Sequence, residues 1–455
     1  MFAKPADSLY NANKCSINGD PMPINYLNLQ PQISQLGSSA TERLQQVNTR
    51  KEQCLVVLHQ FANKLPDLQK LVEEQSRQNK SLRCAKPFSE ALNAHVACPA
   101  EVPPCVILAA DGSQITPDPH GAVFYGLINV GVFRMSLGKG EAPQTNTWSD
   151  LVYEDSDPEN TEYISEDLIS LKRDVFEREI MATLVKQETA PILTFTDGPL
   201  ELYHEPRNEQ VFRKHFDQYI SALQELALQE TLTAGYIDRP RAALLVTLLE
   251  LAVTSTPKEH PFAGVSDLDL MKDLLAPGER SALFTLQSSS SDKYPEKLAL
   301  HFFYLNVGSA THPAIARVEI PLWVAGSTAK VDLIQRVLLD QAAQSGAHPY
   351  PYALTRAHET AVVKLDEHEY LDDLIQKELL ARGVPLAELS EKLINKLVGK
   401  RTRYWDEHNS HRQIITFQHS RLRGWLQAQR ADHPSFWANA AHPAGRAHPG
   451  IRPDL

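Results

Sequence analysis

The sequence predicts an α/β fold in which a mixed β-sheet is flanked by helices. Two short apolar runs, 105–110 and 191–196, are typical of buried strands, and Asp-Gly follows each of them. Segments with helical periodicity lie between and after these runs, without the strict βαβ repeat of a parallel sheet. Hydrophobic residues make up 42% of the chain and charged residues 22%, which suits a globular protein with a large core.

The N-terminal part predicts two different segments. Residues 1–38 are rich in Asn, Pro, Ser and Gln, which predicts an extended or disordered arm. Residues 39–99 predict a helical region, in which Pro66 either kinks a helix or begins a second one. A coiled-coil-like apolar stripe predicts a packing surface, within a helical hairpin or between two copies of the chain. The stripe consists of Cys54, Leu58, Phe61, Leu65, Leu68 and Val72.

Residues 100–370 hold the rest of the predicted sheet and its helices. The stretch 122–132 predicts a hairpin partner for the first strand, and polar, Asp-rich sequence follows over 138–157. Residues 371–455 are predicted to form a C-terminal helical extension with a disordered tail. Further helices are expected at about 162–187, 208–230, 241–253 and 329–344, and further strands at 297–306 and 314–324.

Charge and composition limit the class of protein. A net charge of −11 argues against broad electrostatic binding of DNA, so a nucleic-acid partner would need a local basic surface. The segments 392–403 and 238–241 are candidates, although each could instead be a solvated helix end or loop. No run of about 18 apolar residues predicts a membrane span, and the N-terminus lacks the apolar core of a secretory signal. Five cysteines without Cys-x-x-Cys spacing predict a reduced, cytoplasmic protein.

Asp111 and Asp197 are the first candidate site residues. Each follows an apolar strand, at the carboxyl end where sheet proteins tend to build active sites. Two carboxylates at one edge of a sheet can hold a divalent metal ion. The alternative is that Asp-Gly is simply a common way to leave a strand, because both residues are favoured in turns.

Five motifs follow one another along the chain. They are Asp111-Gly112-Ser113, the Arg-x-x-x-Glu pattern of Arg173 and Glu177, Asp197-Gly198-Pro199-Leu200, residues 316–324, and the segment from Tyr350 to His358. Together they resemble the NurA family of nucleases, DNA end-processing enzymes that work with a HerA-type ATPase. The resemblance spans roughly residues 100–370 and implies an RNase H-like core, DNA as substrate and a hexameric HerA-like translocase as partner.

Phosphodiester cleavage explains why carboxylates would be needed. Two divalent ions about 4 Å apart activate the attacking water and neutralise the leaving oxygen. Mg²⁺ and Mn²⁺ prefer oxygen ligands, so Asp111 and Asp197 are suitable metal ligands. A third carboxylate would come from the helix before Asp197. Glu177 fits the Arg-x-x-x-Glu pattern and is preferred over Glu179, but either could be a solvated surface glutamate.

Tyr350 and His358 complete the catalytic residues that the resemblance implies. His358 would be a metal ligand, or a group that orients the attacking water or the scissile phosphate. Read alone, a single histidine in a helix is more often a core or capping residue. Tyr350 could hydrogen-bond a phosphate or stack on a base. Ser113 could face a phosphate or merely stabilise a turn, and Tyr352 is a weaker neighbour.

Three functions remain open from the sequence. The first is a divalent-metal nuclease that trims DNA ends in double-strand break repair. The second is a metal phosphoesterase acting on RNA or small nucleotides, and the third is a catalytically silent adaptor of the same fold. No Walker-type loop or Gly-x-Gly-x-x-Gly fingerprint is present, so ATP hydrolysis by this chain is not expected.

Overall fold

The computed structural model describes residues 24–118, 124–153, 164–189, 191–202, 209–254, 259–346 and 348–383. The chain forms two compact units, one of residues 1–119 and 123–379 and the other of residues 120–122 and 380–455. The second unit lies almost wholly outside the described residues. So do the basic segment 392–403 and the predicted tail, and the features below belong to the first unit.

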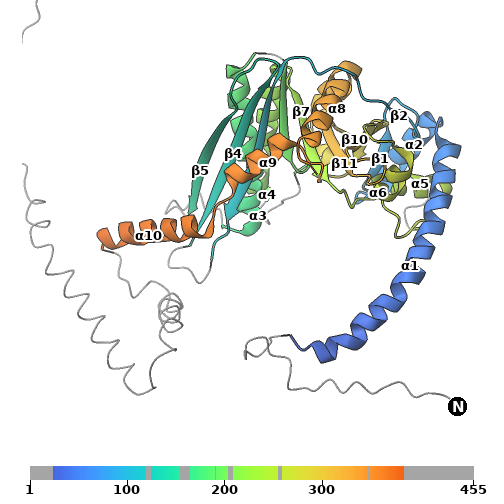
Figure 1. The fold of residues 1–455 in the computed structure, drawn as a ribbon, viewed down its shortest axis with the longest axis horizontal. Coiled ribbons are helices and arrows are strands. Elements are labelled where there is room, and N and C mark those ends of the chain that lie inside the picture. Colours follow the sequence, from blue (N-terminus) through green and yellow to red (C-terminus); the bar gives the residue numbers. More distant parts are fainter. Residues whose placement is uncertain are drawn as a thin grey trace, which may run out of the picture. The chain divides into compact units, whose positions relative to one another are not determined.

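A mixed sheet organises the first unit (Figure 1). Strands β3, β4 and β5 form an antiparallel meander, while β6 and β7 run parallel to β3 on its other side. The order β5-β4-β3-β6-β7 is that of an RNase H-like core, which confirms the predicted fold class. Beyond β7 the sheet continues with antiparallel strands. The strands are β1 (Cys84–Pro87), β2 (His95–Val96), β3 (Cys105–Ile115), β4 (Tyr125–Leu137), β5 (Gln144–Tyr153), β6 (Ile192–Asp197), β7 (Leu232–Asp238), β8 (Arg280–Ser281), β9 (Phe284–Gln287), β10 (Leu300–Asn306) and β11 (Ile315–Pro321).

Helices cover both faces of the core strands (Figure 1). Alternate residues of β3 enter two separate clusters, because successive side chains of a strand point to opposite faces. Val106 and Leu108 pack with α3 and α4, whereas Ile107 and Ala109 pack with α8 and α9. The helices are α1 (Tyr26–Phe61), α2 (Leu65–Gln78), α3 (Glu166–Leu184), α4 (Glu209–Leu228), α5 (Leu244–Thr254), α6 (Asp267–Leu274), α7 (Leu322–Ala325), α8 (Thr328–Ala343), α9 (Tyr352–Ala361) and α10 (Leu365–Ala381).

The two Asp-Gly pairs differ in structure. Asp197 is the last residue of β6, and Gly198 leaves the strand with φ of +94°, as a glycine turn should. Asp111-Gly112 is not a turn, so that prediction is wrong. Strand β3 continues to Ile115 because β4 pairs with it along its whole length, from Cys105↔Leu137 to Ile115↔Leu127. Asp111 therefore lies inside a strand.

Other elements also differ from the sequence predictions. Residues 26–38, expected to be extended, are helical and belong to α1. Residues 144–153 form β5, whose side chains are mostly exposed, so this edge strand shows no apolar alternation. Pro66 lies in the first turn of α2 and begins a second helix.

The N-terminal stripe packs within the chain. Cys54, Leu58, Leu68 and Val72 are buried in the larger core cluster. By contrast, Ile33, Leu36 and Leu44 of α1 are exposed. No helix in the described ranges is both long and apolar enough to cross a membrane.

Candidate active site

Asp111 and His358 meet although they lie far apart in the chain. Asp111 projects from β3 toward the face that α9 covers, and His358 Nδ1 lies 2.7 Å from Asp111 Oδ2. The histidine side chain is 63% exposed and that of Asp111 is 14% exposed. His358 is therefore not a core residue, and one of its ring nitrogens already faces a carboxylate.

Strands β3 and β4 hold α9 in place at its carboxyl end. The carbonyl of Ala361 accepts hydrogen bonds from Ser113 Oγ at 2.5 Å and from Asn129 Nδ2 at 2.7 Å. Helix-end carbonyls lack partners within the helix, so these two bonds satisfy a group that would otherwise be orphaned. Ser113 thus fixes α9, a role that the sequence did not reveal.

Asp197 lies beside Asp111 at the same edge of the sheet. Ala110 pairs with Thr196 in the parallel register, so the two aspartates follow on adjacent strands and point to the same face. The Tyr350 hydroxyl donates a hydrogen bond to the Asp197 carboxylate. Tyr350 also packs edge-to-face on Tyr236, with ring centroids 5.3 Å apart. The structure thus gathers Asp111, Asp197, Tyr350 and His358 on one face.

Burial, a hydrogen bond and neighbouring charges all act on the pKa of the Asp197 carboxyl. Burial raises its pKa, the hydrogen bond from Tyr350 lowers it, and the charge of Asp111 raises it again. The net effect is a raised pKa. Burial, together with the Asp197 charge, likewise raises the pKa of Tyr350, so its hydroxyl remains a donor. The site therefore concentrates negative charge that a bound cation would offset.

Glu177 approaches from the opposite face of the sheet, on α3. A Cβ atom at Gly112 would lie only 2.4 Å from Glu177 Oε1, so the carboxylate rests against the glycine that follows Asp111. Burial and Asp174 raise the pKa of Glu177 well above its usual range, and Arg173, whose Nε is 3.7 Å away, opposes them. Glu179 is half-buried, and burial alone raises its pKa. Of the two glutamates, Glu177 is the one beside Asp111.

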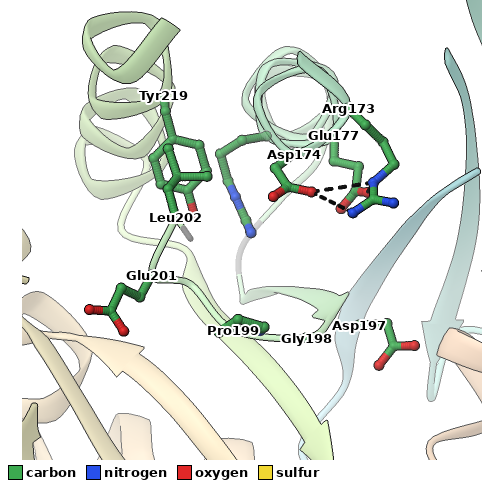
Figure 2. Close-up of a pocket in the computed structure, with 10 residues that line it drawn as sticks. Arg173, Asp174, Glu177, Asp197, Gly198, Pro199, Glu201, Leu202 and Tyr219 are labelled. Carbon is green, nitrogen blue, oxygen red and sulfur yellow. Dashed lines mark hydrogen bonds and ion pairs between the residues drawn. The ribbon is translucent and has the colours of Figure 1, made fainter. Parts of the chain in front are cut away.

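A cavity of about 190 Å³ borders two of these carboxylates. In Figure 2, the side chains of Asp174, Glu177 and Arg173 extend from α3 and lie close together. Gly198 and Pro199 lie across the cavity from them. Glu201 lines the other end and is paired with Arg83 at 2.6 Å. Glu177 and Asp197, which belong to different elements, thus share one space.

The donor types fit a hard divalent cation, since three of the four candidate ligands are carboxylates. Within the described part of the chain, however, no three Asp, Glu, His or Cys side chains already lie close enough to hold a metal ion. Glu177 is engaged by Arg173, and His358 by Asp111. Binding an ion between Asp111, Asp197 and Glu177 would require these side chains to rotate toward one another.

Three residues near the site, Tyr352, Tyr236 and Asp238, differ from what the sequence predicts. Tyr352 packs edge-to-face on Phe133 at 5.8 Å, as part of the α9 interface rather than of the carboxylate cluster. Sequence reasoning missed Tyr236 and considered Asp238 only as part of the candidate basic segment 238–241, because β7 was not predicted as a strand. Asp238 ends β7 next to β6, and its charge contributes to the raised pKa of Asp197.

Gly112→Ala should reduce nuclease activity more than stability. The new methyl group would lie 2.4 Å from Glu177 Oε1 and 2.6 Å from Arg173 Cγ, so both side chains would have to shift. We expect a loss of about tenfold or more in cleavage rate, because misplacing a supporting group costs that much, and only a modest fall in melting temperature. Gly126→Ala is the matched control. Gly126 lies in β4 of the same sheet but away from the carboxylates, and its methyl group would lie 2.6 Å from Ile169 Cδ1 of α3. Equal activity losses in both variants would contradict this role of Gly112.

Comparison with known proteins places the chain in a family. The sequence model of the NurA domain matches residues 105–363, and no curated protein matches the chain. Among solved structures, the NurA nuclease from Sulfolobus solfataricus is 12% identical, covering 71% of this chain and 95% of that chain with a TM-score of 0.42. The catalytic domain of human endonuclease V is 14% identical, covering 70% and 99% with a TM-score of 0.29. Because the family match spans more than half of its residues, the chain belongs to the NurA family, a family of nucleases.

Proposed function

We propose that this chain is a divalent-metal-dependent DNA nuclease that processes DNA ends. The observation that carries the proposal is that Asp111 and Asp197 directly follow the paired residues Ala110 and Thr196 on adjacent parallel strands. Glu177 of α3 lies against Gly112, the residue after Asp111. Carboxylates from two strands and a helix supply the oxygen ligands that Mn²⁺ or Mg²⁺ prefers.

Each site residue has a distinct task in this proposal. Bound divalent ions, two by family analogy, would supply an activated water and neutralise the leaving oxygen. Asp111, Asp197 and Glu177 would hold them. Tyr350 orients the Asp197 carboxylate through its hydrogen bond. His358 orients Asp111, and its exposed ring is placed to contact the scissile phosphate or a metal ion.

Partners follow from the family rather than from the site. We infer that a HerA-like hexameric ATPase delivers DNA to this nuclease, because the sequence lacks a nucleotide-binding loop of its own. A homodimer is supported by the exposed apolar residues Ile33, Leu36 and Leu44 on α1, since such side chains commonly pack against a second helix. Sedimentation analysis of the purified chain, alone and with the ATPase, tests both inferences.

The function is tested by cleavage of labelled linear DNA, single- and double-stranded, with Mn²⁺, with Mg²⁺ and with excess chelator. Cleavage is expected with either metal and should disappear with the chelator. An RNA of the same sequence separates a DNA nuclease from a phosphoesterase that acts on RNA. If intact DNA remains with every metal, the assay is repeated with the ATPase present. Intact DNA in that assay as well would exclude the proposal.

Glu177→Gln should lower the cleavage rate on the order of 10²-fold or more, because loss of a metal ligand costs at least as much as loss of an outer-shell partner. Glu179→Gln is the matched control on the same helix, and it should retain nearly full activity. Metal titration of each variant is the second measurement. A higher Mn²⁺ requirement for Glu179→Gln than for Glu177→Gln would reverse the assignment.

A further inference from the structure

An acidic protein that cuts DNA needs cations where the strand lies. The chain carries a net charge of −11, and the carboxylates of the site add negative charge to the edge where DNA would have to bind. Two of the arginines near that edge are engaged by carboxylates. Arg173 pairs with Asp174 at 2.9 Å, and Arg356 pairs with Glu359. Exposed arginines without such close partners are better suited to contact phosphates.

The turn after β7 supplies two such side chains. Strand β7 lies next to β6, with Tyr236 paired to Asp197, so the turn begins two residues beyond the catalytic edge. The side chain of Arg239 is 75% exposed, and its only ion pair with a described residue is a 3.7 Å contact to Asp238. Arg241 is exposed and makes no hydrogen bond or ion pair with the described residues. An exposed ion pair such as that of Arg239 with Asp238 contributes little to stability.

The backbone of the turn is unusual in the same place. Arg239 has φ of +43°, in the left-handed region that favours glycine, and it precedes a buried proline, Pro240. Such a conformation is unfavourable for a residue with a side chain. An arginine therefore occupies a backbone position, next to the proposed active site, that a glycine would adopt with less strain.

We propose that Arg239 and Arg241 bind the phosphodiester backbone of the nucleic-acid strand beside the scissile phosphate, on the Asp197 side of the site. The inference rests on the proposed function, because it assigns phosphate contacts of that same site. Guanidinium groups suit this task, since their planar donors match phosphate oxygens. The two arginines are positioning residues, which set affinity and register rather than the chemical step.

The test measures binding and cleavage of an end-labelled duplex over a series of salt concentrations. Variants are Arg239→Gly, Arg241→Gln and the double substitution. Each lost guanidinium should weaken binding by about three- to tenfold, whatever the DNA sequence. It should also flatten the plot of log affinity against log salt by roughly 0.9. The rate at saturating DNA should change less than about twofold.

Arg239→Gly separates charge from backbone. Glycine accepts the positive φ, so a purely structural role predicts unchanged affinity and equal or higher stability for this variant. Arg239→Lys, which keeps the charge, should restore most of the salt slope. Arg77→Gln, which removes an exposed arginine of α2, a helix that packs against β1 rather than against β6 or β7, is the control and should leave the slope unchanged.

The outcomes separate this inference from the function that it rests on. Wild-type cleavage with an unchanged salt slope and affinity in the double variant overturns the inference alone. A wild-type chain that neither binds nor cleaves DNA, even with the ATPase, overturns the proposed function and the inference with it. A salt slope flattened equally by Arg77→Gln would show diffuse charge attraction and would also overturn the assignment to this turn.

Discussion

Asp111→Asn and Asp197→Asn are each expected to lower the rate of DNA cleavage by at least about 10³-fold while the chain stays folded. Asparagine keeps the shape and the acceptor oxygen but removes the charge that, in the proposed mechanism, would hold a divalent ion, and such an ion stabilises the transition state by several kcal/mol. The folded state should not suffer, because Asp111 and Asp197 repel each other when both are charged. Single-turnover cleavage in Mn²⁺ and thermal melting are the two measurements.

A melting temperature equal to or above that of the wild-type chain would be the signature of a functional charge pair. Asp238→Asn is the local control, because it removes a carboxylate from the same edge of the sheet, on β7. This control should retain activity within about threefold, a change that corresponds to well under 1.4 kcal/mol. If Asp238→Asn is as inactive as the other two variants, the metal site has been assigned to the wrong strands. If both asparagine variants cleave normally, the mechanism is wrong.

Gly131→Ala should displace α9 and lower the free energy of unfolding by about 2–3 kcal/mol. A Cβ atom on this β4 residue would lie 2.5 Å from the backbone nitrogen of Ala361 and 2.7 Å from the carbonyl oxygen of Ala357. Both atoms belong to the helix backbone, so no side-chain rotation can relieve the clash. Moving α9 moves His358 away from Asp111, so cleavage should fall as well. Chemical denaturation and the cleavage assay check both effects.

Two further variants test whether Gly131→Ala lowers the activity by displacing α9. Gly37→Ala adds a methyl group in α1 where nothing lies within 4 Å, so it should stabilise the chain slightly and leave cleavage unchanged. A cycle with His358→Ala tests the coupling. If Gly131 acts through His358, adding Gly131→Ala to His358→Ala should cause little further loss of activity. Fully additive losses would refute this route.

The sheet could be predicted from sequence where its residues carry a strong local pattern. The runs 105–110 and 191–196 are apolar because both faces of β3 and β6 are covered, which makes them recognisable without any partner. Strand β5 was missed for the opposite reason. It lies at the edge of the sheet with most side chains in solvent, so its residues carry no alternation, and only its hydrogen bonds to β4 make it a strand.

The sequence indicates candidate site residues but not how they are arranged in space. Asp111 was placed in a turn because Asp-Gly favours turns locally, whereas pairing with β4 overrides that preference. Helix-face reasoning could not decide between Glu177 and Glu179. That choice depends on Gly112, which leaves room for the Glu177 carboxylate from the other side of the sheet. The contacts of Ser113 and Gly131 with α9 join residues far apart in the sequence, so no local pattern could reveal them.

The contact between Asp111 and His358 also has a consequence for biosynthesis. The two residues are separated by 247 positions, so β3 and β6 leave the ribosome long before α9 exists. A nascent chain, or a product truncated before residue 352, carries both aspartates but has no helix to cover that face of β3 and β4. Contacts of such long range also form late in folding. A chain that ends before residue 352 would therefore carry both aspartates without the histidine that contacts Asp111, and the candidate site is complete only once α9 has been made.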